Sequence, residues 1–258
     1  MTGSGQGGAA PGGEAPALPE GWRLEVHEAL PSTSDLLFRR AEAGEPEGLA
    51  ILARQQTAGR GRAGRAWASP PGNLYLSVLL RPPGPAREAP QWSLLAGVAL
   101  AEAAAEVVPE AGALRLKWPN DLLRDGAKCA GILAESALTP AGGLAWISLG
   151  IGVNLAHAPA VADRPTATLG ASTAPEAFAA RLLRRLDHWR AVQRAAGFGP
   201  VRAAWLRFGP RPGEAVTLRG LDGAGAFAGL AEDGSLLIET DGTRRAIPAG
   251  EVLSQGDA

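Results

Sequence analysis

Four short segments of this sequence combine glycine with cationic and amide side chains, a combination that suits the binding of an anionic ligand. They are GRGRAGRAW at residues 59–67, KWPND at 117–121, KCAGILAE at 128–135 and GIGVNL at 150–155. Glycine lets the backbone approach a ligand closely, while arginine and lysine supply the positive charge that phosphate and carboxylate oxygens attract. We therefore expect these segments to form one site for a ligand that carries phosphate or carboxylate.

The segment at 59–67 places three glycines and three arginines at alternate or nearly alternate positions. Its backbone amides could donate to a ligand while the guanidinium groups clamp phosphate oxygens. The alternative is a disordered arginine–glycine segment of an RNA-binding protein. We favour the ligand-binding loop, because the segment lies between two predicted strands and a long loop inside a domain is usually functional.

Lysine and asparagine are scarce in this chain. Of 25 basic residues only Lys117 and Lys128 are lysine, and the three asparagines are Asn73, Asn120 and Asn154. A coding bias against both residue types explains the scarcity. Under such a bias, the lysines and asparagines that remain are expected where arginine, aspartate or serine cannot replace them, as in a tight pocket that needs a compact charge. These five positions are therefore candidate site residues.

Each remaining segment also has a purely structural interpretation. Residues 117–121 taken alone would be a turn between strands, and Lys128 would be a strand-edge lysine that discourages aggregation. Asn154 would be a buried cap at a strand end, although its amide also suits the edge of a base. Gly131, inside a strand, permits close approach of a flat ligand. The scarcity of lysine favours the functional interpretation.

Composition excludes several classes of protein. Cys129 is the one cysteine and the three histidines are scattered, so neither a disulfide framework nor a dedicated metal-ligand cluster is expected. The net charge of −1 does not favour binding of nucleic acid or membrane by bulk charge. The sequence has no P-loop motif and no helix-opening GxGxxG motif. The first twenty residues lack the features of a signal peptide, so we expect a cytoplasmic protein with a disordered leader.

The elements that must position these residues follow from hydrophobic periodicity and turn signals. Strands are predicted at 22–27, 48–53, 72–80, 114–118, 122–124, 128–136 and 144–154. Helices are predicted at about 31–43, 90–108, 175–196 and 201–208. After 209–213 (GPRPG), short strands separated by Asp-Gly pairs indicate a small antiparallel barrel. The predicted organisation is a leader at 1–20, a catalytic domain at 21–208 and the barrel at 209–258.

At its four segments the sequence resembles the biotin protein ligase family (biotin–acetyl-CoA-carboxylase ligases), and the resemblance extends over roughly residues 22–253. It implies an α+β fold with a central mixed sheet and helices, of the class II synthetase-like type, followed by a small SH3-like barrel. Some members carry an N-terminal winged helix that binds DNA. Only about thirty residues precede the helix-capping segment here, so we expect the short class, with no DNA-binding domain.

The resemblance implies that the chain uses ATP to activate biotin as biotinyl-5′-AMP and transfers the biotinyl group to a lysine of a partner. The partner would be the biotin carboxyl carrier protein of acetyl-CoA carboxylase or of a related carboxylase. ATP, biotin and Mg²⁺ are the small molecules implied. No membrane partner is expected, and the chain would act as a monomer or a homodimer.

The resemblance also implies roles for individual residues. The biotin-binding set is Ser32, Thr33, Ser34 (where the family usually has asparagine), Gln56, Arg60, Gly61, Arg62 and Lys128. The nucleotide-binding set is Arg60, Arg62, Trp67, Asn120 and Asn154. The catalytic set is Lys128, Arg62, Lys117 and Asp121. Asp121 would either hold the metal ion or take the proton of the acceptor lysine, and the sequence does not choose between these roles.

Two rival functions remain for a protein of this kind. One is a lipoate ligase or octanoyl transferase of the same fold, and the other is a biotin sensor without ligase activity. The arginine–glycine loop at 59–65 and KWPND at 117–121 favour biotin over lipoate, and the expected lack of a DNA-binding domain argues against the sensor.

Overall fold

The computed structural model describes residues 17–108, 114–162, 164–170, 172–218, 224–248 and 252–253. Most of the predicted leader, residues 1–16, lies outside the described residues. Leu18, at the end of the predicted leader, packs against the main hydrophobic core.

The larger of two sheets is a mixed sheet of seven strands in the order β1-β2-β3-β7-β6-β5-β4. The pairing of β1 with β2 is parallel, and the remaining pairings in this sheet are antiparallel. The strands are β1 (Arg23–His27), β2 (Leu49–Ala53), β3 (Leu74–Leu80), β4 (Leu114–Lys117), β5 (Asp121–Arg124), β6 (Ala127–Leu138) and β7 (Leu144–Val153). Each of these strands matches its predicted range to within two residues at both ends.

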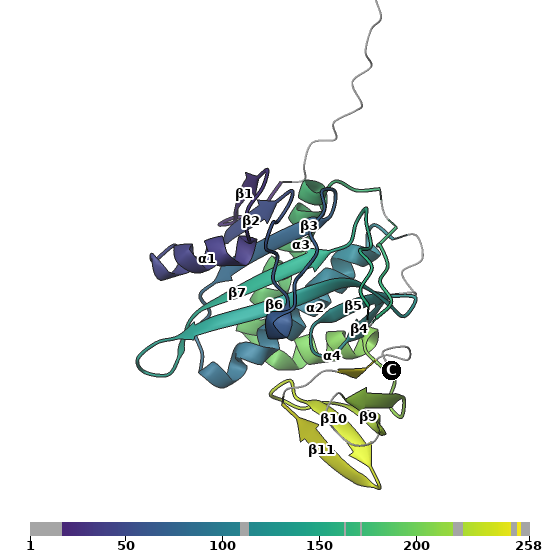
Figure 1. The fold of residues 1–258 in the computed structure, drawn as a ribbon. Coiled ribbons are helices and arrows are strands. Elements are labelled where there is room, and N and C mark those ends of the chain that lie inside the picture. The colour runs from purple at the N-terminus through teal and green to yellow at the C-terminus, as the bar shows by residue number, and fades with distance from the viewer. Residues whose placement is uncertain are drawn as a thin grey trace, which may run out of the picture.

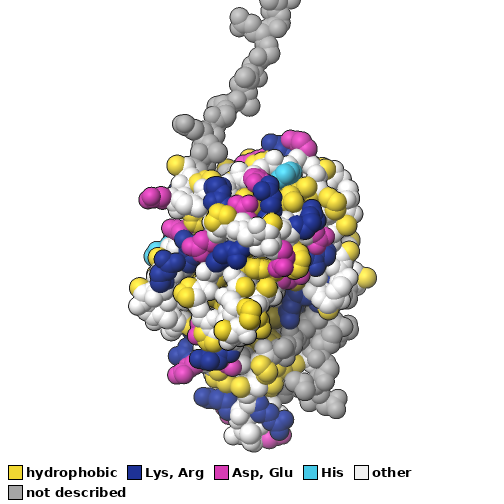
Figure 2. Space-filling view, turned by 90° about the vertical axis from the view of Figure 1, so that its left-hand side faces the viewer, with side chains coloured by type: hydrophobic (Ala, Val, Ile, Leu, Met, Phe, Trp, Pro, Cys, Tyr) yellow, Lys and Arg dark blue, Asp and Glu magenta, His cyan; other side chains and the backbone are white. Residues whose placement is uncertain are grey.

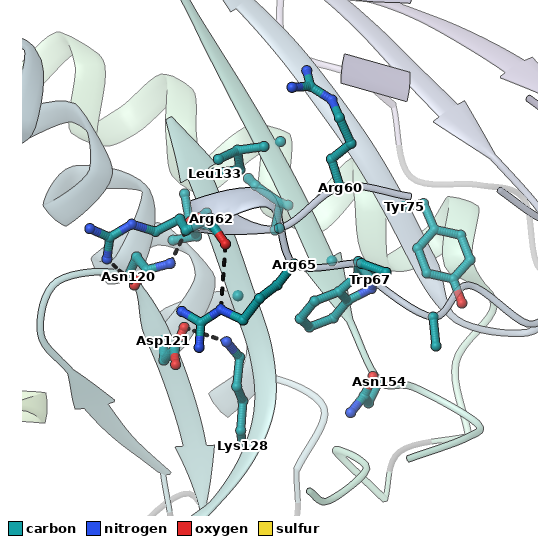
Figure 3. A pocket seen from close by; sticks show the side chains of 18 of the residues that line it. Arg60, Arg62, Arg65, Trp67, Tyr75, Asn120, Asp121, Lys128, Leu133 and Asn154 are labelled. Carbon is teal, nitrogen blue, oxygen red and sulfur yellow. Dashed lines mark hydrogen bonds and ion pairs between the residues drawn. The ribbon is translucent and has the colours of Figure 1, made fainter. Parts of the chain in front are cut away.

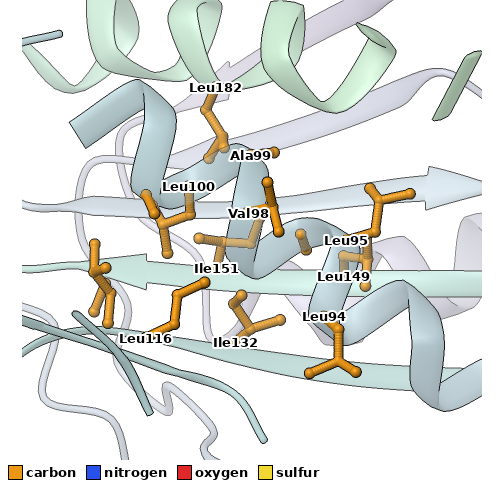
Figure 4. Packing of buried hydrophobic residues seen from close by; sticks show 14 of the residues in the cluster. Leu94, Leu95, Val98, Ala99, Leu100, Leu116, Ile132, Leu149, Ile151 and Leu182 are labelled. Atoms are coloured by element: carbon orange, nitrogen blue, oxygen red, sulfur yellow. The ribbon is translucent and has the colours of Figure 1, made fainter. Parts of the chain in front are cut away.

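Three helices cover one face of this sheet (Figure 1). They are α2 (Ala89–Ala105), α3 (Pro175–Ala196) and α4 (Phe198–Phe208). Of the 17 residues of α2, 12 are buried, because this helix is enclosed between the sheet and the other two helices. Figure 4 shows Leu95 and Val98 of α2 packed against Leu149 and Ile151 of β7, with Leu182 of α3 on the outer side. This face therefore holds the core.

The opposite face carries α1 (Thr33–Glu42) over one part of the sheet. The Ser32 hydroxyl caps this helix by accepting a hydrogen bond from the Asp35 amide at 3.3 Å. Leu37 and Ala41 of the helix form a small second core with Trp146. Because α1 is short, the face formed by β5, β6 and the end of β7 is left for the loops.

The smaller sheet has five antiparallel strands in the order β11-β10-β9-β8-β12. They are β8 (Ala215–Leu218), β9 (Ala224–Leu230), β10 (Leu236–Thr240), β11 (Thr243–Ile247) and β12 (Val252–Leu253). The Trp118 indole Nε1 donates to the Gly234 carbonyl at 3.1 Å, and the Trp205 ring lies 6.5 Å from that of Phe227. The small sheet is therefore packed on the main body, next to the predicted KWPND segment.

The predicted α+β class, with a central mixed sheet and a small antiparallel unit after it, is confirmed. The boundary predicted between 208 and 209 stays a prediction, and α4 ends at Phe208 while β8 begins at Ala215. On the face in Figure 2, cationic and anionic side chains are interspersed, in keeping with the net charge of −1. None of the helices in the described parts of the chain is long and apolar enough to cross a membrane.

Candidate functional site

A cavity opens on the sheet face opposite α2, where β5, β6 and β7 are not covered by α1. Its empty space is about 1180 Å³, the open solvent at its mouth included. All four segments singled out in the sequence contribute to its lining. The tertiary structure thus brings together residues as far apart in the chain as Thr33 and Thr166, and it unites the four segments as the sequence predicts.

The predicted site residues line this cavity with one exception. Those that line it are Thr33, Ser34, Gln56, Arg60, Gly61, Arg62, Trp67, Lys117, Asn120, Asp121, Lys128 and Asn154. Ser32 is the exception: its side chain is buried and caps α1. The structure therefore places Ser32 as the residue that fixes the start of the helix carrying Thr33 and Ser34.

The floor of the cavity is made of glycine backbone. Gly131 of β6 and Gly152 of β7 are paired across the two strands, and the indole of Trp67 lies against both. A Cβ atom at Gly152 would come within 2.5 Å of the Trp67 ring, and one at Gly131 within 3.2 Å. At Gly150 it would come within 2.7 Å of the Ser34 hydroxyl. Glycine is therefore required here so that flat and polar groups can reach the sheet.

An ion pair lies at the centre of the cavity. Lys128 Nζ is 2.7 Å from Asp121 Oδ1, and the two side chains are 16% and 10% exposed. Lys117 is the register partner of Asp121 across the β4–β5 hairpin, so a second ammonium group is held on the same hairpin. Lys128 Nζ also lies 5.5 Å from the ring centroid of Trp67. The two lysines of the chain thus flank one carboxylate.

The glycine loop reaches across the cavity to the KWPND segment (Figure 3). Arg62 Nη1 donates to Asn120 Oδ1 at 3.0 Å. The Asn120 amide is itself fixed, because its Nδ2 donates to the Ile132 carbonyl at 2.7 Å. Arg65 points toward Asp121 and Lys128, and its Nε donates to the Arg62 carbonyl at 3.4 Å. Arg62 therefore joins the two segments.

Arg60 is directed away from this cluster (Figure 3). Its guanidinium group lies 2.8 Å from Asp35 Oδ1 and donates to both carboxylate oxygens of Glu135, at 3.1 and 3.0 Å. Arg60 borders the cavity, but two carboxylates outside it bind its charged end.

Hydroxyl and amide groups form a hydrogen-bonded chain at the α1 end of the cavity. Ser34 Oγ lies 3.2 Å from Ser77 Oγ, which lies 2.8 Å from Thr33 Oγ1. The Thr33 hydroxyl and the Thr33 amide both donate to Gln56 Oε1, at 3.1 and 2.8 Å. All of these side chains except Gln56 are buried.

The same chain continues from Gln56 to the segment that carries Trp67. Gln56 Nε2 donates to Ser69 Oγ at 3.0 Å, and the Ser69 hydroxyl donates to the Trp67 carbonyl at 2.9 Å. Because the Thr33 hydroxyl proton is directed to Gln56, the Ser77 hydroxyl donates to Thr33, and the Ser34 hydroxyl donates to Ser77 in turn. The Ser34 oxygen is then left as an acceptor at the cavity, suited to an N–H group.

Sequence reasoning missed several residues of the site. Ser69 and Ser77 were not singled out, although Ser77 lies on the polar side of a strand predicted from its alternation. A segment after β7 also borders the cavity, because backbone hydrogen bonds join Lys128 to Pro165 and Ala167. The missed lining residues include Pro159, Val161, Arg164 and Thr166. A single sequence carries no signal for these residues, since residues of these types are common in loops and strands.

Four of the five scarce lysines and asparagines line the cavity, and Asn73 does not. The Asn73 amide donates to the His157 carbonyl at 2.8 Å and accepts from the amides of Ala156 and His157, both at 2.9 Å. Asn73 therefore joins the start of β3 to the chain after β7. Nearby, burial raises the pKa of Tyr75 to about 12, with a smaller opposing effect from the Asn73 side chain.

The charge of the cavity is strongly positive. Among the described residues that line it, six are cationic (Arg60, whose charged end lies outside, and Arg62, Arg65, Lys117, Lys128 and Arg164), and Asp121 is the one carboxylate. A concave, cationic surface concentrates anionic ligands. No group of three or more potential His, Cys, Asp or Glu metal ligands occurs among the described residues. The arrangement suits an elongated anion with a polar head at Ser34, a charged centre at Lys128 and a flat group beside Trp67.

Comparisons with known proteins agree with this geometry. A family model described as the biotin/lipoate A/B protein ligase family matches residues 26–154. A biotin–[acetyl-CoA-carboxylase] ligase of Paracoccus denitrificans is 41% identical over 217 residues, which cover 80% of this chain and 90% of that protein.

Two solved structures share the fold over most of their length. The biotin protein ligase from Aquifex aeolicus in complex with biotin and ATP has a TM-score of 0.72 at 28% identity, covering 90% of this chain and 98% of that one. The biotin protein ligase from Leishmania major in complex with biotinyl-5-AMP has a TM-score of 0.60 at 26% identity, covering 88% of this chain and 98% of that one.

Proposed function

The chain belongs to the biotin/lipoate A/B protein ligase family, and we propose from this premise that it is a biotin protein ligase. It uses ATP to convert biotin to biotinyl-5′-AMP and transfers the biotinyl group to a lysine of a carboxyl carrier protein. The observation that carries this function is the Lys128–Asp121 pair, which shares one cavity with the hydrogen-bonded hydroxyl groups and with Trp67. The resemblance to biotin protein ligases found in the sequence is confirmed.

Biotin would lie with its ureido ring at the hydroxyl chain and its carboxylate at Lys128. A ureido group has two N–H donors and one carbonyl acceptor, and the Ser34 oxygen and its neighbours offer the matching groups. Ser34 has a shorter side chain than the family's asparagine, and a hydrogen bond with Ser77 holds its hydroxyl group in place. Thr33, Ser34 and Gln56 are therefore the proposed contacts to the ring.

Adenylation brings two anions together, so its main requirement is positive charge. A biotin carboxylate oxygen attacks the α-phosphorus of ATP, a new phosphorus–oxygen bond forms, and the bond to pyrophosphate breaks. Lys128, Lys117 and Arg62 surround the position where the two anions would meet, and in a partly buried site their charge stabilises the transition state. Rigid positioning of the reactants supplies a further part of the rate.

The nucleotide would occupy the other end of the cavity. The indole of Trp67 is held against Gly131 and Gly152, and its other side can stack on adenine. Asn154 is buried at the same end, where its amide suits the edge of a base. Arg62 and Asn120 then lie nearer the phosphates, so that the loop covers the adenylate and excludes water.

Mg²⁺ is proposed to arrive with ATP rather than to occupy a protein cage. Mg²⁺ is commonly held by one or two carboxylates together with substrate phosphates. Asp121 is the one carboxylate among the described residues that line the cavity, and it fits this requirement. The ion would neutralise phosphate charge. Asp121 has an alternative role as the base that accepts the proton of the acceptor amine.

In the second step, the amine of the acceptor lysine attacks the carbonyl carbon of the mixed anhydride. An amide bond forms, the carbon–oxygen bond to AMP breaks, and AMP leaves with the electron pair. The amine must be neutral to attack, so one proton is lost to a base or to solvent. The two lysines of this chain both line its own cavity, which places the chain on the donor side of the transfer.

One assay separates biotin ligation from the rival functions. Purified protein is incubated with labelled ATP, Mg²⁺ and a biotin carboxyl carrier domain, with either biotin or lipoate. Release of AMP and biotinylation of the acceptor should both depend on biotin. Attachment of lipoate to the acceptor in place of biotin would establish a lipoate ligase. Binding of biotin without release of AMP would establish a sensor.

A further inference from the structure

Arg60 makes a set of ion pairs that the reaction itself does not require. Its Nε lies 2.8 Å from Asp35 in the first turn of α1, and its two terminal nitrogens donate in parallel to the two oxygens of Glu135 on β6, at 3.1 and 3.0 Å. Parallel donation by a guanidinium group to a carboxylate is the strongest geometry that this pair can adopt. One arginine of the loop therefore joins a helix and a strand outside the cavity.

The rest of the loop depends on where Arg60 is held. Gly59 accepts a hydrogen bond from the Trp67 amide at 2.9 Å, and Arg60 is the bridge partner of Ala66, so the two ends of the loop are tied together. On the cavity side the loop is joined to Asn120 by Arg62. The pairs of Arg60 fix the opposite side, so the loop is held from both sides of the cavity mouth.

Charge also keeps Arg60 at this position. Asp35 and Glu135 together carry two negative charges, and Arg60 is the cation that both of them contact. If the guanidinium group turned into the cavity to meet a phosphate, it would leave those two carboxylates without its charge. Its side chain is 40% exposed, so salt should weaken these pairs.

We propose that Arg60 is a positioning residue, which anchors the glycine loop over the bound adenylate through Asp35 and Glu135. The proposal rests on the proposed function and adds two residues to it, neither of which lines the cavity. The anchor keeps the reactive anhydride enclosed until the acceptor lysine arrives. Loss of the anchor opens the loop and lets biotinyl-AMP escape.

The test compares R60Q with the double variant D35N/E135Q, which removes the anchor from its other side. In the ligand-free proteins, amide hydrogen exchange over residues 59–66 should rise by the same factor in both variants. Escape of biotinyl-AMP to a bulk amine should also rise equally in both, by roughly three- to tenfold, the effect expected of exposed ion pairs. Combining all three changes should add nothing further, and R60K should restore part of the retention.

Salt and a matched control complete the design. Raising the ionic strength should increase escape from the wild-type protein but have little effect in either variant. The control is R23Q, which removes an ion pair of 2.8 Å between Arg23 and Glu45 at similar exposure, on β1. R23Q should change neither the exchange of the loop nor the escape of the adenylate.

Two results would overturn the proposal. If R60Q abolishes adenylate formation while D35N/E135Q retains it, Arg60 acts on the ligand and not through the carboxylates. If loop exchange is unchanged in both variants, the ion pairs hold nothing in place. A wild-type protein that makes no biotinyl-AMP would instead refute the proposed function, and the exchange measurement would still test the anchor by itself.

Discussion

At the scale of single residues, the site depends on a compact ammonium group held by a carboxylate. Lys128 lies between Asp121 and the ring of Trp67, and its side chain is largely shielded from solvent. Shielding strengthens the attraction of the ammonium group for anionic ligands and limits the space for a larger guanidinium group. This explains why a chain with 25 basic residues keeps lysine at this position.

We predict that Lys128→Ala lowers the rate of biotinyl-AMP formation by about 100-fold or more, a typical cost of removing a transition-state charge contact. The fold should persist, because Lys128 contributes little to the apolar core. Pyrophosphate release in single turnovers measures the rate, and circular dichroism monitors the fold. Near-normal adenylate synthesis by this variant would exclude the proposed role.

The hydroxyl chain makes a second prediction at this scale. Ser77→Ala removes the group between Thr33 and Ser34 and should weaken biotin binding by roughly two- to tenfold, the usual worth of one hydrogen bond. Isothermal titration with biotin alone measures the effect. Ser148→Ala is the matched control, since Ser148 is a buried serine on β7 whose hydroxyl has no partner. Equal losses of biotin affinity in both variants would show that the hydrogen-bonded hydroxyl groups play no part in binding.

At the scale of elements, the cavity exists because β6 and β7 carry glycine where other strands carry side chains. Glycines at 131, 150 and 152 remove the side chains that would otherwise fill this face of β6 and β7. The short β4–β5 hairpin holds Lys117 and Asp121 opposite each other. The loop at 59–67 then covers the floor, tied to the hairpin through Arg62 and Asn120.

We predict that Arg62→Gly increases escape of biotinyl-AMP to bulk amines, because it removes the contact to Asn120 and adds backbone freedom to the loop. The expected increase is about tenfold or more, since a charge-assisted hydrogen bond and the proposed phosphate contact are lost together. Labelling of an unrelated lysine-rich protein measures the escape. Arg87→Gly, an exposed change in the short helix before α2, is the control. Unchanged escape from Arg62→Gly would show that this residue does not close the loop.

At the scale of the whole molecule, the two faces of the large sheet have different roles, one in stability and one in ligand binding. Its α2 face holds the core, and its other face holds α1 and the cavity. The small sheet is joined to the hairpin beside the cavity through Trp118 and Gly234. Ligand binding and global stability should therefore be linked, because the cavity is built from elements that are also part of the common fold.

Cys129 provides a probe of this linkage. It is fully buried, its thiol contacts the Leu122 carbonyl at 3.4 Å, and burial raises its pKa to about 12. The raised pKa means that the neutral thiol favours the folded state. Its contribution to stability is therefore complete below the pKa of the unfolded thiol and is lost as the pH rises toward 12.

We predict that a thiol reagent at pH 8 modifies Cys129 only when the protein unfolds. Biotin alone at 100 times its dissociation constant should slow the modification by about 100-fold, because the ligand binds the native state. The rate of modification is followed by mass spectrometry over a urea series, in parallel with tryptophan fluorescence. Rapid modification of the native protein would contradict the burial of the Cys129 thiol. The absence of any effect of biotin would contradict the link between ligand binding and stability.

Whether a prediction from the sequence succeeded depends on the kind of interaction behind it. Periodicity and turn signals located the strands and helices, since these depend on neighbouring residues. The scarcity of lysine and asparagine identified four residues of the cavity, but it also selected Asn73, which joins two chain segments. The resemblance to the family's motifs did not distinguish Ser32 from its neighbour Thr33. Ser32 caps α1, whereas Thr33 lines the cavity.

The sequence by itself determined the family, the order of the elements and the segments that carry the chemistry, because each is written in local spacing and residue type. Only the tertiary structure decided which side chains meet. It placed Ser77 beneath Ser34, Arg62 on Asn120, and Arg60 between two carboxylates outside the cavity. These partners come from elements far apart in the chain, and the packing of the sheet sets their distances and the direction of each side chain.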